Sequence, residues 1–274
     1  MVHGKIMNIM LILLLSFSYL YSYEDKDEEI NKNVNSVVNL SIGFSNASSD
    51  AKFFEKYNKI IGGFNTEIKT NLNFSFSTKY EFNKKYRIGY SISYLQFSMY
   101  DTFEQNINNS GLSTRLVNED FKMIDFPVLL MFEYNPRQGQ QFKTYGGIAL
   151  GTTVTKMYWN EEINTYDWDK RKGGLRYDEL MFFPIIRLYA GTELGFDKEE
   201  KQSMLGGITI EPRINYVFRK IDFFSVISNQ FENHVNSLNE SFWFNNFIFE
   251  INFGITINFY HNKKEVQNGN ERNI

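Results

Sequence analysis

The sequence predicts an all-β fold, an eight-stranded antiparallel up-and-down transmembrane β-barrel. The first observation is segment 241–259, where large apolar residues occupy most odd positions and polar or small residues most even positions from 243 onward. A period of two is typical of a β-strand with one apolar and one polar face. The segment is far longer than an ordinary strand of about 5–6 residues. The other two observations are that this alternation recurs along the chain and that short and long connections follow one another in strict order.

Seven earlier segments repeat the alternation and are predicted to form the other strands. Segment 121–134 is less regular, because residues 128–132 are apolar on both parities. With the terminal strand the total is eight, an even number, as single-chain bacterial barrels require. In chain order the seven predicted strands are 38–44, 67–82, 86–94, 121–134, 147–154, 187–196 and 207–216.

The connections between the predicted strands fall into two classes. The short, polar ones are 83–85, 135–140 and 197–202, and the long ones are 46–63, 101–118, 160–177 and 220–240. In an up-and-down barrel, alternate connections lie at the same rim. One rim therefore carries tight turns and the other carries long loops, which is the arrangement of periplasmic turns and extracellular loops in outer-membrane barrels.

Glycine indicates which face of each strand points inward. Most strand glycines share the polar parity, and the lumen of an eight-stranded barrel is only just wide enough for side chains. The many Phe and Tyr residues of the apolar parity need an outer surface without a volume limit. A soluble lipocalin-like barrel with the opposite polarity is the alternative. The glycines on the polar parity are Gly43, Gly89, Gly147, Gly151, Gly191, Gly195, Gly207 and Gly254.

The polar parity also predicts a charged lumen. Charges removed from water are costly unless they pair, so we expect Arg187 and Arg213 to pair with acids of neighbouring strands, and Glu250 to lie beside Arg213. The pairs would form a structural plug, and a charged path for ions or a small solute is the alternative. The predicted ion-pair network comprises Glu67, Lys69, Arg187, Glu193, Glu211, Arg213 and Glu250, and the same parity also carries Lys79, Arg87, Asp125 and Glu133.

The ends of the chain have a different composition from the barrel. Residues 1–22 are predicted to be a secretory signal peptide, with Lys5 before an apolar run. Residues 23–35 are predicted to be a flexible acidic lead-in, 36–260 the barrel, and 261–274 a polar periplasmic tail. No later window approaches the roughly 18 consecutive apolar residues of a spanning helix.

Composition excludes several kinds of chemistry. The chain has no Cys, which removes disulfides, thiol catalysis and zinc–thiolate sites. The net charge of −3 and the lack of a basic block do not suggest a nucleic-acid partner. We expect no enzymatic activity, no metal and no cofactor. A hydrolytic site around His234, with Ser237 and Glu240, and a calcium site in the acidic, aromatic loop 159–169 are the alternatives weighed.

Segment 124–134, a polar turn and segment 144–151 together resemble the outer-membrane β-barrel family that includes PorT-like and OmpX-like proteins. Residues 126–130 (FPVLL) fill the place of the family's strand with Pro before apolar residues, and Tyr145-Gly146-Gly147 with Gly151 fill that of its aromatic-Gly-Gly strand. Segment 207–216 is similar to the family's strand with Glu and Arg two residues apart. The resemblance covers about residues 36–260. The polar tail after Tyr260 departs from the terminal aromatic residue by which assembly machinery recognises many such barrels.

These observations predict a monomer in the cell outer membrane, surrounded by lipid and folded by the barrel assembly machinery. The predicted role is structural or surface-interactive, with long loops that contact a host surface or an extracellular ligand. A narrow pore for small solutes and an accessory barrel of a secretion system, which the resemblance implies, are the alternatives.

Overall fold

The computed structural model describes residues 30–47, 51–70, 72–83, 85–106, 114–136, 142–164, 171–196, 205–222 and 242–264. The chain divides into one compact unit of residues 34–260, which holds the barrel, and a second of residues 1–33 and 261–274. The predicted signal peptide lies outside the described residues. No helix in the described ranges is long and apolar enough to cross a membrane.

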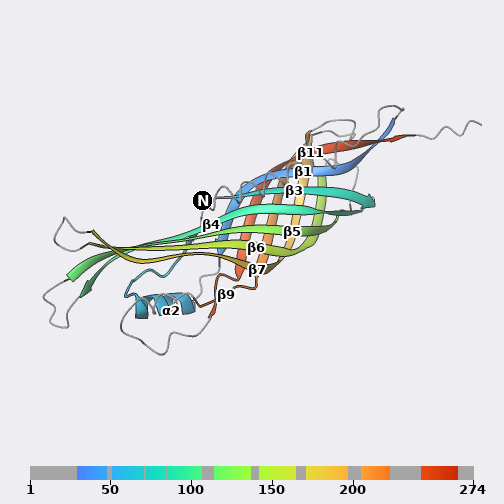
Figure 1. Cartoon of the computed structure of the whole chain (residues 1–274). Coiled ribbons are helices and arrows are strands. Elements are labelled where there is room, and N and C mark those ends of the chain that lie inside the picture. The colour runs from blue at the N-terminus through green and yellow to red at the C-terminus, as the bar shows by residue number, and fades with distance from the viewer. Residues whose placement is uncertain are drawn as a thin grey trace, which may run out of the picture. The chain divides into compact units, whose positions relative to one another are not determined.

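Long strands dominate the described chain, with a single described helix among them (Figure 1). Several strands exceed 20 residues, about twice the length needed to span a bilayer at a tilt. The elements are β1 (Ile30–Ala47), α2 (Ala51–Ile60), β2 (Lys69–Thr70), β3 (Leu72–Asn83), β4 (Tyr86–Asn106), β5 (Thr114–Tyr134), β6 (Phe142–Asn164), β7 (Arg171–Gly195), β8 (Leu205–Val217), β9 (Lys220–Ile221), β10 (Phe242–Trp243) and β11 (Phe247–Lys264).

The sheet closes on itself. Its order is β2-β4-β3-β1-β11-β8-β7-β6-β5, and β4 also pairs with β5. Because β2 and β3 lie one after the other along β4, the wall has eight antiparallel positions. The predicted eight-stranded antiparallel barrel is therefore confirmed, and the last strand lies beside the first as expected.

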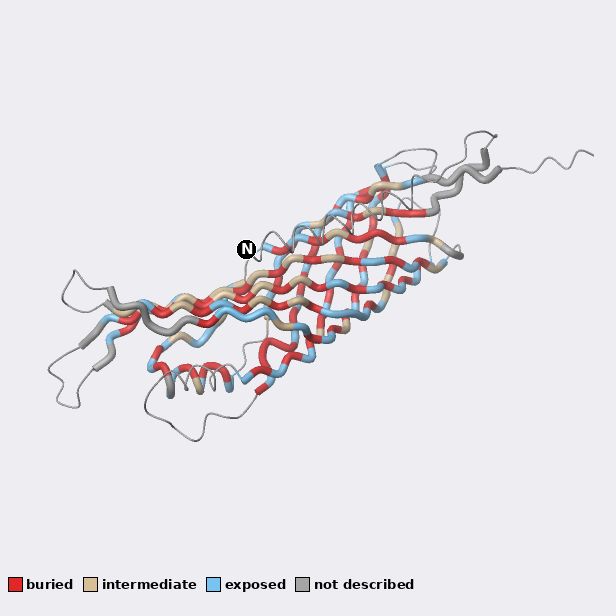
Figure 2. Tube along the Cα trace, viewed as in Figure 1, coloured by how far each residue is buried: buried red, intermediate tan, exposed pale blue. Residues whose placement is uncertain are grey.

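Buried and more exposed residues alternate along the strands, as the colours of Figure 2 show. The alternation also resolves the ambiguous segment of β5, where Leu129 and Met131 are buried while Val128, Leu130 and Phe132 are exposed. Exposed apolar side chains form a continuous band on the outward face, which we call the apolar belt. Its members include Leu40, Ile42, Phe74, Ile88, Tyr90, Leu130, Phe132, Ile148, Leu150, Phe182, Leu188, Ile208, Ile210, Ile214, Phe249, Ile251, Phe253 and Ile255.

The structure corrects several predicted boundaries. Strand β1 begins at Ile30, inside the predicted lead-in 23–35, and β11 continues to Lys264 in the predicted tail. The predicted loops 101–118 and 160–177 are largely strand, because β4 to β7 run far past the belt. The first long connection contains α2. Because their outward side chains are polar, segments 101–118 and 160–177 are predicted as loops, although their strand parts keep the period of two.

Candidate functional site

The polarity of the two faces reverses along the long strands. On β4, inward side chains are polar up to Ser93 and apolar from Leu95 to Met99. The outward side chains change in the opposite sense between Tyr94 and Gln96. On β5 and β6 the outward faces turn polar at Lys122 and Lys156. The parts of β4 to β7 beyond this reversal form a second region, the sheet extension, comprising residues 96–106, 114–123, 156–164 and 171–179. The interior therefore has a polar layer within the belt and an apolar layer next to the extension.

The polar layer is built around one chain of alternating charges, which we call the ion chain. Arg87 lies 3.2 Å from Glu133, which also pairs with Lys79. The Lys79 ammonium is 3.7 Å from Glu211, whose other oxygen lies 2.6 Å from Arg213. From Arg213 the chain continues to Glu250 at 3.6 Å and then to Arg187 at 3.3 Å. All seven residues are at most 5% exposed, and six strands contribute them.

Neutral groups add hydrogen bonds to the ion chain. Arg187 donates to Asn215 at 2.6 Å and to Ser93 at 3.3 Å, and Arg213 donates to Ser75 at 2.9 Å. The Tyr145 hydroxyl donates to Glu211 at 2.8 Å. Such contacts reduce the cost of removing paired charges from water. These contacts link the ion chain to neighbouring side chains across the polar layer.

Glycine makes room for the large side chains of the polar layer. A Cβ at Gly191 would lie 2.5 Å from the Tyr145 ring, and one at Gly147 would lie 2.5 Å from the Tyr189 hydroxyl. Both distances are too short for any side chain. The predicted concentration of glycine on the inward parity therefore has a steric cause.

A buried ion pair separates the two layers. Arg219, just after β8, pairs with Asp125 of β5, and both side chains are fully buried. Asp125 also accepts from Thr155 at 2.6 Å. The Arg219 guanidinium lies 5.6 Å from the Phe183 ring and 3.1 Å from the Met123 sulfur, so it contacts both the Asp125 carboxylate and apolar side chains.

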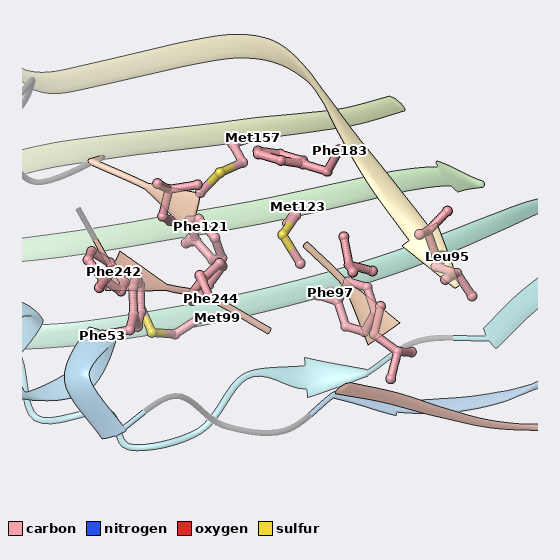
Figure 3. Close-up of a cluster of buried hydrophobic side chains, with 14 of the residues drawn as sticks. Phe53, Leu95, Phe97, Met99, Phe121, Met123, Met157, Phe183, Phe242 and Phe244 are labelled. Atoms are coloured by element: carbon pink, nitrogen blue, oxygen red, sulfur yellow. The ribbon is translucent and has the colours of Figure 1, made fainter. Parts of the chain in front are cut away.

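The apolar layer is a dense cluster of aromatic and Met side chains with α2 packed into it, which we call the aromatic plug (Figure 3). The Phe53 ring of α2 lies 4.7 Å from Phe244 and 5.6 Å from Phe121, measured between centroids. The ring centroids of Tyr57 and Trp159 lie 5.7 Å apart. A ten-residue helix is marginal alone in water, so these contacts stabilise α2. Other members are Phe54, Ile61, Leu95, Phe97, Met99, Phe103, Met123, Met157, Phe183 and Phe242.

Asp101 on β4 fastens α2 and the segment that follows it. One carboxylate oxygen accepts from the Tyr57 hydroxyl at 2.8 Å and from the backbone amides of Phe64 and Asn65 at 2.8 and 2.9 Å. Hydrogen bonds to a charged acceptor are stronger than those between neutral groups. Burial and this carboxylate together raise the pKa of Tyr57, which remains a neutral donor.

Three carboxyl groups lie in one row across the sheet extension. Asp101 on β4 is opposite Glu119 on β5, which is opposite Glu161 on β6. Glu119 is fully buried and Glu161 is 5% exposed. Burial, with added effects from Glu161 and Asp101, raises the pKa of Glu119 to about 10. Glu119 is therefore protonated at neutral pH, which limits the repulsion in the row.

The structure brings together most of the predicted network. Arg187, Glu211, Arg213 and Glu250 belong to the ion chain, and Glu250 faces Arg213 in register. Glu193 is buried nearer the short-turn rim and accepts from Thr256 at 3.2 Å.

The prediction for Glu67 and Lys69 is wrong, since both side chains are exposed. Lys69 is opposite the outward-facing Ser98, whereas Phe74 is opposite Tyr94. The register on β4 thus shifts by one residue between β2 and β3, and such a shift moves a side chain to the opposite face. Lys79, Arg87 and Glu133, which share the polar parity in the sequence, belong to the ion chain.

The other candidate sites receive no support from the described residues. His234 lies outside them, as does part of loop 159–169, whose first residues continue β6. Within the described ranges, no group of three or more His, Asp or Glu side chains could hold a metal ion.

No protein-family model and no curated protein matches the sequence. Among solved structures, the chain is similar to Neisserial surface protein A, with 12% identity over 82% of this chain and 97% of that one and a TM-score of 0.42. For Ail, the attachment invasion locus protein of Yersinia pestis, the identity is 13% over 83% of this chain and 99% of that one, with a TM-score of 0.37. For the outer membrane protein OprG of Pseudomonas aeruginosa, the identity is 13% over 84% of this chain and 99% of that one, with a TM-score of 0.41. The resemblance to PorT-like and OmpX-like proteins stays a prediction.

Proposed function

We propose that the protein is a non-enzymatic outer-membrane β-barrel that holds the sheet extension outside the cell as a binding surface. The observation that carries this proposal is the polarity reversal. A strand surface that changes from apolar to polar, while its inward face changes in the opposite sense, matches a chain leaving lipid for water.

The dimensions of the apolar belt support the membrane part of the proposal. On β8 and at the residue after it, the outward apolar run extends from Ile208 to Phe218, apart from Pro212. This length matches the roughly 9–11 residues that a tilted strand needs to span a bilayer. In water, a belt of this size would be an aggregation hazard. A secretory signal at residues 1–22 would deliver the chain to this membrane.

The filled interior argues against the pore alternative. The ion chain occupies the polar layer, and the aromatic plug occupies the layer above it. A solute would have to displace Arg187, Arg213 and Phe53 together. All three are buried, and each has several partners.

The sheet extension supports a binding role. Its inward face is anchored by the plug, which keeps four long strands in a fixed arrangement. Its outward face presents acidic side chains at Glu104, Glu162 and Asp178, with Lys122 and Lys156 among them. A rigid polar surface of this kind loses little conformational entropy when it binds a partner.

The absence of Cys allows a direct test of topology. Single-Cys variants Thr102→Cys in the extension, Leu150→Cys in the belt and Lys85→Cys at the short-turn rim are exposed to a membrane-impermeant maleimide on intact cells. We expect labelling of Thr102→Cys alone, and labelling of Lys85→Cys only after the outer membrane is permeabilised. Equal labelling of Lys85→Cys and Thr102→Cys on intact cells would contradict the proposed orientation.

Cell adhesion tests the binding role. Cells that carry the protein with Glu104→Lys and Glu162→Lys should attach less to host-cell layers than cells that carry the parent at the same surface level. The matched control is Leu150→Ile in the belt, which leaves the extension unchanged. Unaltered attachment by the charge-reversed protein would overturn the assignment of the extension as the binding surface.

A further inference from the structure

A groove opens on the outer wall where one strand pairing ends. Strand β1 pairs with β3 only as far as the pair Phe44 and Leu72, although β1 continues to Ala47. Beyond that point β2 pairs with β4, at a register shifted by one residue. Strands β1 and β2 do not pair there, and a groove of about 750 Å³ lies between β1, β2 and the outward face of β11.

The groove is amphipathic. Its floor consists of Phe44, Phe249, Ile251 and Phe253, all of them exposed side chains of the apolar belt. Its rim carries Glu67 and Lys69, both exposed. The volume lies within the range of about 300–1,000 Å³ that is typical of ligand pockets. An occupant therefore needs an apolar chain on one side and a head with charges of both signs on the other.

We propose that this groove binds one phospholipid whose headgroup carries both a phosphate and an amine. An acyl chain lies on the aromatic floor, Lys69 binds the phosphate and Glu67 binds the ammonium. The belt already meets lipid under the proposed function, so this inference rests on it and adds one specific lipid position. The rim charges suit this headgroup, because the Lys69 ammonium supplies a positive charge for a phosphate and the Glu67 carboxylate a negative charge for an amine.

Native mass spectrometry of the full-length barrel in detergent tests the proposal, with phosphatidylethanolamine as the probe. Phosphatidylglycerol and a neutral glycolipid provide the headgroup arms, and glycerophosphoethanolamine provides the head without chains. We expect one phosphatidylethanolamine per barrel, and about tenfold weaker binding for Lys69→Gln, as expected for the loss of a charge-assisted contact. Phe249→Ala should weaken all diacyl lipids, and Glu67→Gln should remove the preference for phosphatidylethanolamine over phosphatidylglycerol.

The matched control is Leu188→Ala, an exposed belt residue on β7, for which binding should be unchanged. Heat-modifiable migration identifies the folded barrel in each variant, and Lys69→Gln keeps the test valid if Phe249→Ala does not fold. Equal loss in Leu188→Ala and Lys69→Gln, or no loss in either, would overturn the site, because the lipid would then bind the belt without preference. Binding of glycerophosphoethanolamine as tight as that of the lipid would overturn the role of the floor. Failure of the topology test with an intact lipid site would contradict the proposed orientation alone.

Discussion

Replacing Phe53 by Ala should release α2 from the aromatic plug without unfolding the barrel. Phe53 is fully buried, and its ring lies within 6.3 Å of those of Phe54, Tyr57, Phe121, Phe242 and Phe244. Removing a buried Phe side chain typically costs about 3–5 kcal/mol. A ten-residue helix has little stability of its own, so this loss is large compared with what keeps α2 docked.

Trp159 reports the change, because it contacts Tyr57 and is fully buried. With Trp168→Phe and Trp243→Phe, it is the single Trp of the chain. In this background Phe53→Ala should raise acrylamide quenching of Trp159 severalfold and shift its emission to longer wavelength. Glu55→Ala, at an exposed position of α2, is the control and should leave both unchanged. Unaltered quenching in a folded Phe53→Ala barrel would refute the view that Phe53 holds the helix in place.

Three further predictions concern other parts of the interior. Arg213→Met should destabilise the barrel by about 3–5 kcal/mol, because it leaves Glu211 and Glu250 with fewer buried partners. Lys122→Met breaks a partly exposed pair with Asp120 and should cost about 0–1 kcal/mol. Thermal unfolding in detergent compares the two variants, and equal effects would contradict the ion chain. Gly89→Ala should prevent folding, because the new Cβ would lie 2.0 Å from the Thr78 carbonyl oxygen. Gly146→Ala should fold, because its Cβ would meet no atom closer than 3.5 Å. The yield of folded barrel on refolding from urea should separate the two variants. Glu119→Gln should stabilise the extension, and the gain should grow from pH 5 to pH 9. The folded parent keeps Glu119 protonated because its pKa is raised to about 10, whereas Glu119 of the unfolded chain ionises above its usual pKa, so the parent loses stability as the pH rises. Hydrogen exchange of β5 measures this, and identical pH profiles of parent and variant would contradict it.

The barrel could be predicted because its pattern is local. A period of two fixes the face of each side chain, and glycine at the inward positions follows from the lack of space around residues such as Tyr145 and Tyr189. The pairing of Arg213 with Glu250 followed from the adjacency of consecutive strands. These inferences needed only strand order and parity.

The parts that were missed depend on information that periodicity does not contain. The register shift between β2 and β3 moved Glu67 and Lys69 to the outward face, and nothing in the alternation announces a shift of one residue. The sheet extension could not be predicted from a rule that places apolar residues on the outward face, because Leu95, Phe97 and Met99 point inward. The apolar residues at 53, 54 and 57 of α2, with residue 61 just after it, do have helical spacing, which is the signal that could have revealed the helix.

The central claim is that the interior is filled by a polar and an apolar layer. The most direct test is the conductance of the purified full-length barrel in a planar bilayer. The ion chain and the aromatic plug together predict an inserted protein that passes no steady current in potassium chloride at either polarity. Insertion is verified separately by protection of the belt residues from a water-soluble probe. A steady, salt-dependent current from inserted parent protein would contradict the filled interior.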